Sequence, residues 1–327
     1  GRGSILRQAA RLEIEDLGAP MDVLWFRLSR HADDTDEKLY VTSFLASPIA
    51  GRDPGRDDAG EGHVTVISTA TNNVIGTAIV QPMTSTGFNA NGDALARVAP
   101  GALFTFPTGA YPNQLNNVAI RGGFAYLPNT GASPNGPVRF DVNTQALLSV
   151  LDISSDTDAG VTLNLNQAVA AQASPSRLFP TQPWAMAFRN GSDLGYVVSA
   201  ASNVVLKIAV DPTSGAATVL ADPSDPTRVF EIPVGRNPRG IVVNWNDSRA
   251  YVMNYVSRDV TVLDLTAARE QVLATLPSET LPTPGTAADL VHAGRELYNT
   301  SVGVFDAAIS GRMSASGWSS CASCHPS

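Results

Sequence analysis

A unit of two short strands joined at a turn, the second strand carrying a tyrosine, recurs along the chain and limits its possible folds more than any other feature. In the two clearest copies thirteen positions separate an opening proline from the tyrosine, Pro183 from Tyr196 and Pro238 from Tyr251. A third apolar stretch follows each tyrosine and ends in an aspartate. Because apolar residues alternate along each strand, one unit cannot bury both of its faces alone. Repeated units must therefore stack on one another.

Two further copies lie earlier in the chain, around Tyr126 and Tyr40. We expect strands over residues 23–28, 38–43, 63–67, 117–120, 124–129, 138–141, 183–188, 195–199, 204–211, 238–243, 250–254 and 260–264. Successive tyrosines are 86, 70 and 55 positions apart, against about 40 to 50 in an ordinary repeat of this kind. The long spacings predict either insertions within the units or degenerate units between them, with candidate extra strands at 102–106 and 227–232.

The copies resemble the blades of YVTN-type β-propellers, whose name describes the strands written here as Tyr40-Val41-Thr42-Ser43 and Tyr251-Val252-Met253-Asn254. The resemblance covers roughly residues 20 to 275. It implies an all-β fold, a β-propeller with four recognisable blades and seven as the favoured total. A ring of seven would place further blades upstream of Gly1. A β-sandwich of similar hairpins is the alternative architecture.

Composition agrees with a turn-rich all-β protein. Apolar residues make up 43% of the chain and charged residues 16%, and the 27 glycines and 22 prolines are spread along it. The net charge of −8, with no run of Lys or Arg, argues against a nucleic-acid partner. No stretch approaches the roughly 20 consecutive apolar residues that cross a bilayer, so we expect no membrane span in this chain.

The character of the sequence changes after residue 276. We expect a β-propeller over 1–276, a proline-rich linker over 277–285 and the start of a second, α-helical domain over 286–327. Thr286 can cap a helix over 286–298, with Asp289 three positions on. One face of this helix would carry Leu290, Ala293, Gly294 and Leu297.

The second domain ends in the pattern C-x-x-C-H, formed by Cys321, Cys324 and His325. Two thiols at this spacing can form thioethers to one haem, and the adjacent imidazole can then ligate the iron. The sequence thus predicts covalent haem c, with His325 as the metal ligand. A zinc half-site, a redox dithiol and chance are the alternatives. Zinc usually needs a second cysteine pair, whereas both cysteines of the chain lie in this motif.

Two resemblances extend this prediction. The helix over 286–298 looks like the opening helix of a class I-type cytochrome c domain, in which a glycine and an aromatic residue pack against the closing helix, and Gly294 and Tyr298 fit that pairing. The stretch 312–325 is similar to the first haem site of the bacterial di-haem cytochrome c peroxidases and their methylamine-utilisation relatives. The segment 299–311 is longer than in that family, and a second C-x-x-C-H is missing.

These features favour an exported cytochrome that transfers electrons through its haem, with the propeller as a docking or assembly module. Haem attachment to thiols implies a periplasmic or extracellular location in a bacterium. The expected partners are a redox protein or other cytochrome subunits. One alternative is a di-haem peroxidase-type oxidoreductase with a propeller in front. Another is a propeller that binds a ligand and carries its haem incidentally.

No other residue is assigned a role in chemistry. The sequence has no Gly-x-Ser-x-Gly elbow, phosphate-binding loop or His-Glu-x-x-His pair, so the catalytic residues are left unassigned. The sixth iron ligand is also unassigned, since core packing suits Met313 and a surface or helix face suits His31, His63 and His292. The acidic stretches 33–37 and 53–61 could offer oxygen ligands to calcium, but solvated loops are the favoured interpretation.

Overall fold

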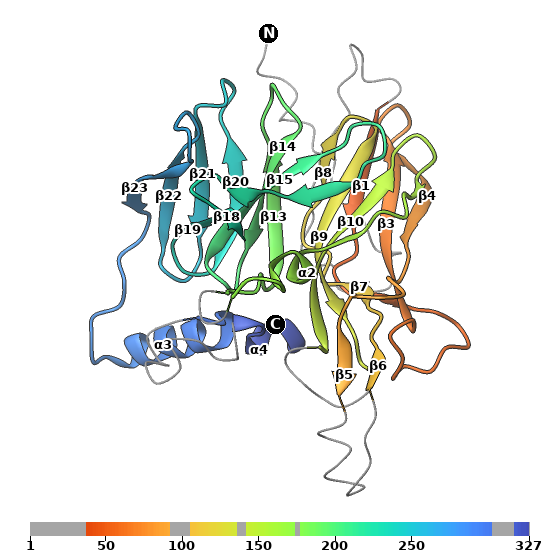
Figure 1. Cartoon of the computed structure of the whole chain (residues 1–327), viewed down its shortest axis with the longest axis horizontal. Coiled ribbons are helices and arrows are strands. Elements are labelled where there is room, and N and C mark those ends of the chain that lie inside the picture. Colours follow the sequence, from red (N-terminus) through yellow and green to blue (C-terminus); the bar gives the residue numbers. More distant parts are fainter. Residues whose placement is uncertain (1–36, 92–104, 136–141, 174–176, 303–316, 327) are drawn as a thin grey trace, which may run out of the picture.

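The computed structural model describes residues 37–91, 105–135, 142–173, 177–302 and 317–326. Four antiparallel sheets stand side by side in a fan, and two helices lie across one end of it (Figure 1). Each sheet contains one of the tyrosine-centred copies, so we number the sheets as blades 1 to 4 in chain order.

The strands divide among the blades as follows. Blade 1 contains β1 (Lys38–Thr42), β2 (Ser47–Pro48), β3 (Gly60–Ser68) and β4 (Asn73–Val80). Blade 2 contains β7 (Tyr111–Asn113), β8 (Ala119–Arg121), β9 (Phe124–Ala132), β10 (Thr144–Asp152), β11 (Thr157–Asp158) and β12 (Leu163–Asn164). Blade 3 contains β13 (Pro183–Phe188), β14 (Leu194–Ser199), β15 (Val204–Val210), β16 (Ala217–Val219) and β19 (Glu231–Pro233). Blade 4 contains β20 (Pro238–Val243), β21 (Arg249–Asn254), β22 (Asp259–Asp264) and β23 (Gln271–Pro277).

Consecutive blades pack face to face through separate apolar cores. Between blades 3 and 4, buried Val198 and Phe230 lie in one cluster with Ile241 and Val252. Equivalent clusters join blade 2 to blade 3 and blade 1 to blade 2. Burying apolar surface between neighbours stabilises the stack, at about 25 cal/mol per Å² removed from water. The prediction of an all-β fold built from stacked units is confirmed, and the stacking of four sheets differs from the two layers of a sandwich.

The repeat unit is larger than the predicted three strands. A fourth strand lies outside the third one in blades 1, 3 and 4, where β4, β16 and β23 are hydrogen-bonded to β3, β15 and β22. In β23 every residue but one is exposed. An outer strand of this kind needs no alternation of apolar and polar residues, which is why periodicity did not predict it.

Insertions account for the long spacings between tyrosines in the described part of the chain. A hairpin of β5 (Asn89–Asn91) and β6 (Thr105–Pro107) separates blades 1 and 2. A second hairpin, β17 (Ala221–Asp222) with β18 (Asp225–Val229), follows β16. The predicted extra strand at 227–232 is divided between β18 and β19, and β19 pairs with β15 of blade 3. Neither hairpin builds a further blade.

Blade 2 requires a correction. Its predicted third strand, 138–141, lies outside the described residues, as does the predicted first strand of blade 1 at 23–28. The strand beside β9 is β10, which ends in Asp152. Asp152 Oδ1 accepts the backbone N–H two residues later at 2.8 Å, as Asp211 does at 2.8 Å and Asp264 at 3.0 Å. The terminal aspartate is therefore a turn-forming residue in three blades.

Helical structure is limited in the described residues to three short helices: α2 (Leu165–Val169), α3 (Ala287–Asn299) and α4 (Cys321–Cys324). The helix predicted from the sequence is α3, and Thr286 Oγ1 accepts the Asp289 N–H at 3.3 Å at its start. Of the partial α-helical domain predicted over 286–327, the described residues contain α3 and α4 and no further helix. None of the described helices has the length and apolar character to cross a membrane.

Candidate haem attachment site

The C-x-x-C-H motif forms a single helical turn. Cys321 and Cys324 are the first and last residues of α4, and the His325 N–H donates to the Cys321 carbonyl at 2.9 Å. Before the helix, the Ser320 N–H donates to Ser323 Oγ at 3.2 Å. These bonds place both thiols and the following imidazole on one turn, as attachment to a single haem requires.

One side of this turn is buried and the other is exposed. Ala322 and Ser323 are 5% and 3% exposed, whereas Cys321 is half-buried and both Cys324 and His325 are exposed. Although the Cys324 residue is exposed, desolvation of its thiol by surrounding protein raises its pKa, and the neighbouring Cys321 adds to the effect. The motif thus combines packed residues, Ala322 and Ser323, with cysteine and histidine residues that are partly or fully exposed.

Trp318 anchors the chain immediately before the motif. Its ring is 3% exposed and lies 4.1 Å from that of Phe179 and 4.8 Å from that of Phe88, between ring centroids. Its Nε1–H donates to the Thr144 carbonyl at 2.8 Å. A buried indole with a satisfied N–H fixes the position of the motif against blade 2.

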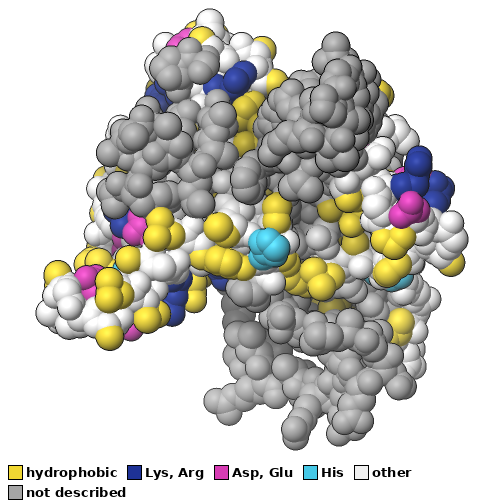
Figure 2. Space-filling view, turned by 90° about the horizontal axis from the view of Figure 1, so that it is seen from below, with side chains coloured by type: hydrophobic (Ala, Val, Ile, Leu, Met, Phe, Trp, Pro, Cys, Tyr) yellow, Lys and Arg dark blue, Asp and Glu magenta, His cyan; other side chains and the backbone are white. Residues whose placement is uncertain are grey.

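Helix α3 lies beside the motif with its apolar side outward. Leu290, Val291 and Leu297 are 72%, 64% and 40% exposed, and Gly294 faces open space. Seen from below, hydrophobic side chains cover much of the projecting part formed by α3 (Figure 2). The Tyr298 hydroxyl donates to the His325 carbonyl, so this residue contacts the motif in the described structure, where a closing helix was expected.

The side chains present fit a covalently attached haem. Two cysteines and one histidine lie on one turn, partly or fully exposed, and the exposed apolar residues of the neighbouring α3 could cover a porphyrin. They do not fit a four-ligand zinc site, because no group of three His, Cys, Asp or Glu side chains among the described residues could hold a metal ion. Haem iron needs no such group, since the porphyrin supplies four of its ligands.

The other predicted ligand candidates lie elsewhere. His63 contacts Ser47 Oγ at 3.0 Å and Glu61 at 2.9 Å on blade 1, and His292 lies on α3. His31 and Met313 lie outside the described residues, as does the stretch 33–36. The side chains of the second acidic stretch bind separate partners and do not converge.

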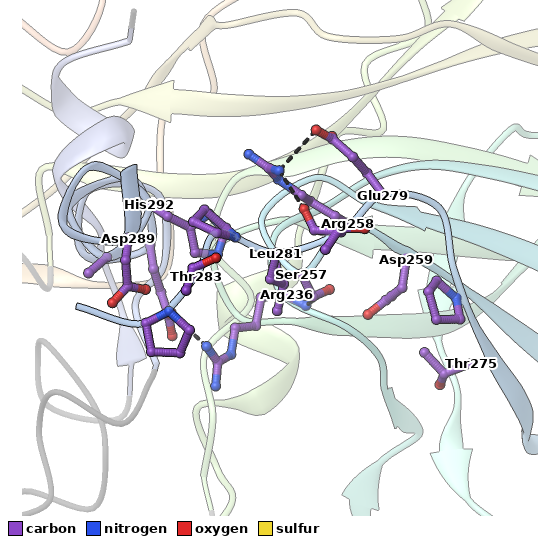
Figure 3. Close-up of a pocket in the computed structure, with 16 residues that line it drawn as sticks. Arg236, Ser257, Arg258, Asp259, Thr275, Glu279, Leu281, Thr283, Asp289 and His292 are labelled. Carbon is purple, nitrogen blue, oxygen red and sulfur yellow. Dashed lines mark hydrogen bonds and ion pairs between the residues drawn. The ribbon is translucent and has the colours of Figure 1, made fainter. Parts of the chain in front are cut away.

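A cleft of about 900 Å³ separates α3 and the linker from blade 4 (Figure 3). Arg236 and Glu296 form an ion pair across it, Nη1 to Oε2, at 2.6 Å. Glu296 Oε1 and His292 Nδ1 are buried but have no hydrogen-bond partner among the described residues. No sequence pattern predicted this cleft, because its walls come from segments that the fold brings together.

Comparison with known proteins finds similarities of structure but none of sequence. No protein-family model matches the chain, and no curated protein matches it in sequence. A hydrazine synthase of Kuenenia stuttgartiensis matches with a TM-score of 0.43 and 11% identity, over 71% of this chain and 56% of the other. A putative 6-phosphogluconolactonase of Bacteroides fragilis matches with a TM-score of 0.46 and 10% identity, over 78% of this chain and 57% of the other.

A periplasmic gluconolactonase of Pseudomonas aeruginosa is similar to the same degree, with a TM-score of 0.42 and 13% identity over 79% of this chain and 58% of the other. The chain thus spans less than two thirds of each of these proteins.

Proposed function

We propose that this protein is an exported c-type cytochrome that transfers electrons through a haem attached to Cys321 and Cys324 and ligated by His325. A haem bound there would supply one-electron oxidation and reduction at its iron. The observation that supports the proposal is the geometry of α4, which brings both cysteines and the histidine onto one helical turn whose other residues, Ala322 and Ser323, are buried.

The chain's own residues would bind and orient the group. The cysteines hold it covalently, and the helical turn fixes the imidazole relative to them. Tyr298 restrains the carbonyl of His325 from α3. The exposed Leu290, Val291 and Leu297 offer apolar surface that would exclude water from the porphyrin. Since thioether formation takes place outside the bacterial cytoplasm, the proposal includes a periplasmic or extracellular location and a redox protein as partner.

The propeller is proposed to form a larger ring than the four described blades, with seven as the favoured number. The supporting observation is the outer face of blade 4, where Tyr251 is 39% exposed although the corresponding tyrosines of the other blades are buried. A neighbouring blade would cover it.

A di-haem peroxidase-type oxidoreductase is the first alternative. The resemblance of 312–325 to the first haem site of that family supports it. It needs a second C-x-x-C-H, whereas the 327 residues contain only two cysteines, both within α4. Electron transfer needs only the one haem that this motif would attach, whereas a second C-x-x-C-H in the complete protein would favour the peroxidase-type alternative.

Ligand binding by the propeller is the second alternative, and the cleft beside α3 favours it. The buried, unpartnered oxygen of Glu296 and nitrogen of His292 could accept or donate hydrogen bonds to a small polar molecule. Isothermal titration with a panel of small polar metabolites, repeated on Glu296→Gln, would detect such a ligand. A response that Glu296→Gln removes would favour this alternative.

Covalent haem is tested by expressing the full chain, with an export signal, in a host that attaches haem c. We expect a pyridine haemochrome spectrum from the denatured protein with one haem per chain. Cys321→Ala and Cys324→Ala should each lose one of the two thioether bonds, which shifts the spectrum. Pro326→Ala, immediately after the motif, is the matched control and should retain both. A denatured chain that keeps no haem would refute the cytochrome function.

A further inference from the structure

Three amide side chains occupy the same position in consecutive blades. In blades 2, 3 and 4 the residue paired with the blade's tyrosine is Ala119, Ala187 and Val242. Gln114, Gln182 and Asn237 each precede that residue by five positions, since 119 − 114, 187 − 182 and 242 − 237 are equal. We call Gln114, Gln182 and Asn237 the amide row.

The backbone of the amide row is unusual in the same way at all three positions. The φ angles are +50°, +53° and +52°, in the left-handed region that residues other than glycine seldom adopt. Such a conformation costs of order 1 kcal/mol or more and persists only where the surroundings demand it. The side chains are also 1%, 3% and 0% exposed. A recurring, strained and buried amide points to a function that glycine cannot supply.

The amide row contacts α4, the residue before it and the end of α3. Gln114 Nε2 donates to the Ser323 carbonyl at 3.0 Å. Gln182 Oε1 accepts from Ser320 Oγ at 3.4 Å. Asn237 Nδ2 donates to the carbonyl of Asn299, at the end of α3, at 3.1 Å. The amide row therefore spans three blades and reaches both α4 and the end of α3, which lie across this end of the propeller (Figure 1).

Neighbouring residues continue the same contact surface. Thr181, beside Gln182, donates from Oγ1 to the Trp318 carbonyl at 2.7 Å. Arg239, two residues after Asn237, donates from Nη2 to Asn299 Oδ1 at 2.9 Å. These are buried or half-buried hydrogen bonds between segments far apart in the sequence. A buried donor or acceptor that lost its partner would lower the stability of the fold.

We propose that Gln114, Gln182 and Asn237 are positioning residues: Gln114 and Gln182 hold the attachment turn from blades 2 and 3, and Asn237 holds the end of α3 beside it from blade 4. The buried contacts of Gln114 and Gln182 with Ser323 and Ser320 leave Cys324 and His325 on the exposed part of the turn. The part of this inference that concerns haem rests on the proposed function. It deepens that function, since a haem held on the outer side would be approached by a redox partner from the side away from the propeller.

Glycine substitutions separate the amide from the backbone turn that carries it. The triple variant Gln114→Gly, Gln182→Gly, Asn237→Gly keeps a residue suited to positive φ and removes only the side-chain contacts. Asn72→Gly is the matched control, because Asn72 has a φ of +56° in an exposed turn of blade 1. Hydrogen–deuterium exchange measured by mass spectrometry on the full chain reports segment by segment.

In the triple variant we expect exchange of the backbone N–H groups over 317–325 to accelerate about tenfold or more, while β14 and β21 keep their protection. Labelling of the haem-free chain gives a second readout, because its only two thiols are those of the motif. Both thiols should react faster in the triple variant than in the native chain, because the turn that partly buries them is no longer held in place. Asn72→Gly should change neither result.

Unchanged protection of 317–325 would overturn the inference. Equal loss of protection in β14 and β21 would also overturn it, because the amides would then stabilise the blades and not the attachment turn. Neither result bears on whether haem is attached, which the haemochrome spectrum decides separately. Failure of this inference and failure of the proposed function are thus distinguishable.

Discussion

A single buried carboxylate joins blades 3 and 4. Glu270 is 1% exposed, and its Oε1 lies 2.9 Å from Arg189 Nη2, 2.5 Å from Lys207 Nζ and 3.0 Å from the Tyr196 hydroxyl. The three donors belong to blade 3, and Glu270 lies between β22 and β23 of blade 4. A charge in this position is tolerated only because it is fully paired.

We expect Glu270→Ala to lower the free energy of unfolding by about 3 kcal/mol, because it leaves two cations without their partner between the blades. Tyr196→Phe should cost about 1 kcal/mol, the typical value of one hydrogen bond. Urea denaturation followed by circular dichroism measures both. Glu279→Ala is the control, since that side chain is 69% exposed in its pair with Arg258, and exposed pairs contribute about 0 to 1 kcal/mol. Equal losses for Glu270→Ala and Glu279→Ala would contradict the prediction.

The contribution of Asp222 to the stability of the fold can be tested at low pH. Arg269 donates two hydrogen bonds to its Oδ2, from Nη2 at 2.7 Å and from Nε at 3.1 Å, and these bonds hold the pKa of Asp222 well below its usual range. A carboxyl whose pKa is lower in the folded state stabilises the fold above its unfolded pKa of about 3.9. That stabilisation is lost as the pH falls through the folded pKa.

We therefore expect Asp222→Asn to reduce stability by roughly 1 kcal/mol at pH 7, a value discounted for the partial exposure of Arg269. The difference between Asp222→Asn and the native chain should shrink below about pH 4 and disappear in strong acid. Thermal unfolding as a function of pH measures it. Asp225→Asn, in the same hairpin, is the control. A difference that persists unchanged in strong acid would refute this account of Asp222.

At the scale of elements, α3 is turned opposite to an ordinary amphipathic helix. Its polar Glu296 and Asn299 are 6% and 7% exposed, whereas its apolar Leu290 and Leu297 face solvent. Ion pairing of Glu296 with Arg236 and hydrogen bonding of Asn299 to Arg239 explain the orientation. These two residues can be buried because each forms at least one bond with the propeller, although Glu296 Oε1 has none among the described residues.

On an ordinary amphipathic helix, replacing an apolar residue lowers the free energy of unfolding more than replacing a polar one. The orientation of α3 predicts the opposite order. Glu296→Ala should lower the free energy of unfolding by about 1 to 2 kcal/mol, and Leu297→Ala by less than about 0.5 kcal/mol. Chemical denaturation of the haem-free chain measures both. A larger loss for Leu297→Ala would show that α3 buries its apolar side after all.

Sequence periodicity predicted the inner elements well. The strands around Tyr196 and Tyr251 and the capped helix at Thr286 lie where the pattern placed them. In β21 buried and exposed residues alternate, and in β14 all residues but the first are buried, and both patterns are typical of strands. The sequence did not predict the outer strands, the third strand of blade 2 or the exposed side of α3. Their structure is determined by pairing partners that are distant in the sequence.

The residues of the attachment site also divide into those that the sequence predicted and those that it did not. Cys321, Cys324 and His325 were predicted because haem attachment fixes their spacing along the chain. Gln114, Gln182 and Asn237 were not predicted, although the two clearest copies contained a signal: an amide fourteen positions before the tyrosine, at Gln182 and Asn237. Only the structure shows that Gln114 shares their position and that the three amides contact α4, the residue before it and the end of α3.

At the scale of the molecule, the tyrosine of each blade contacts the next blade. Tyr40 of blade 1 donates to Asp156 of blade 2 at 2.6 Å, and the ring of Tyr126 in blade 2 lies 5.2 Å from that of Phe188 in blade 3. Tyr196 of blade 3 donates to Glu270, before the last strand of blade 4. In blade 4 the series stops, and Tyr251 is exposed. One face of the fan is therefore left open in the described part of the chain.

That open face is apolar. Val242 and Met253 beside Tyr251 are 62% and 44% exposed. Contiguous apolar surface on this scale marks a site of association. The 327-residue chain should therefore bind a hydrophobic dye and self-associate through blade 4 as its concentration rises.

We expect the double variant Tyr251→Ser, Met253→Ser to weaken this self-association about tenfold, which corresponds to about 1.4 kcal/mol. Sedimentation over roughly a hundredfold range of concentration measures it. Leu290→Ser is the control, because that side chain is 72% exposed on α3, away from blade 4. The fold should survive the double variant, since both residues lie outside the core, whereas Val252→Ser on the buried face of the same strand should destabilise it. A chain that stays monomeric throughout would show that the open face is covered from within, and an equal effect of Leu290→Ser would place the contact on α3 instead.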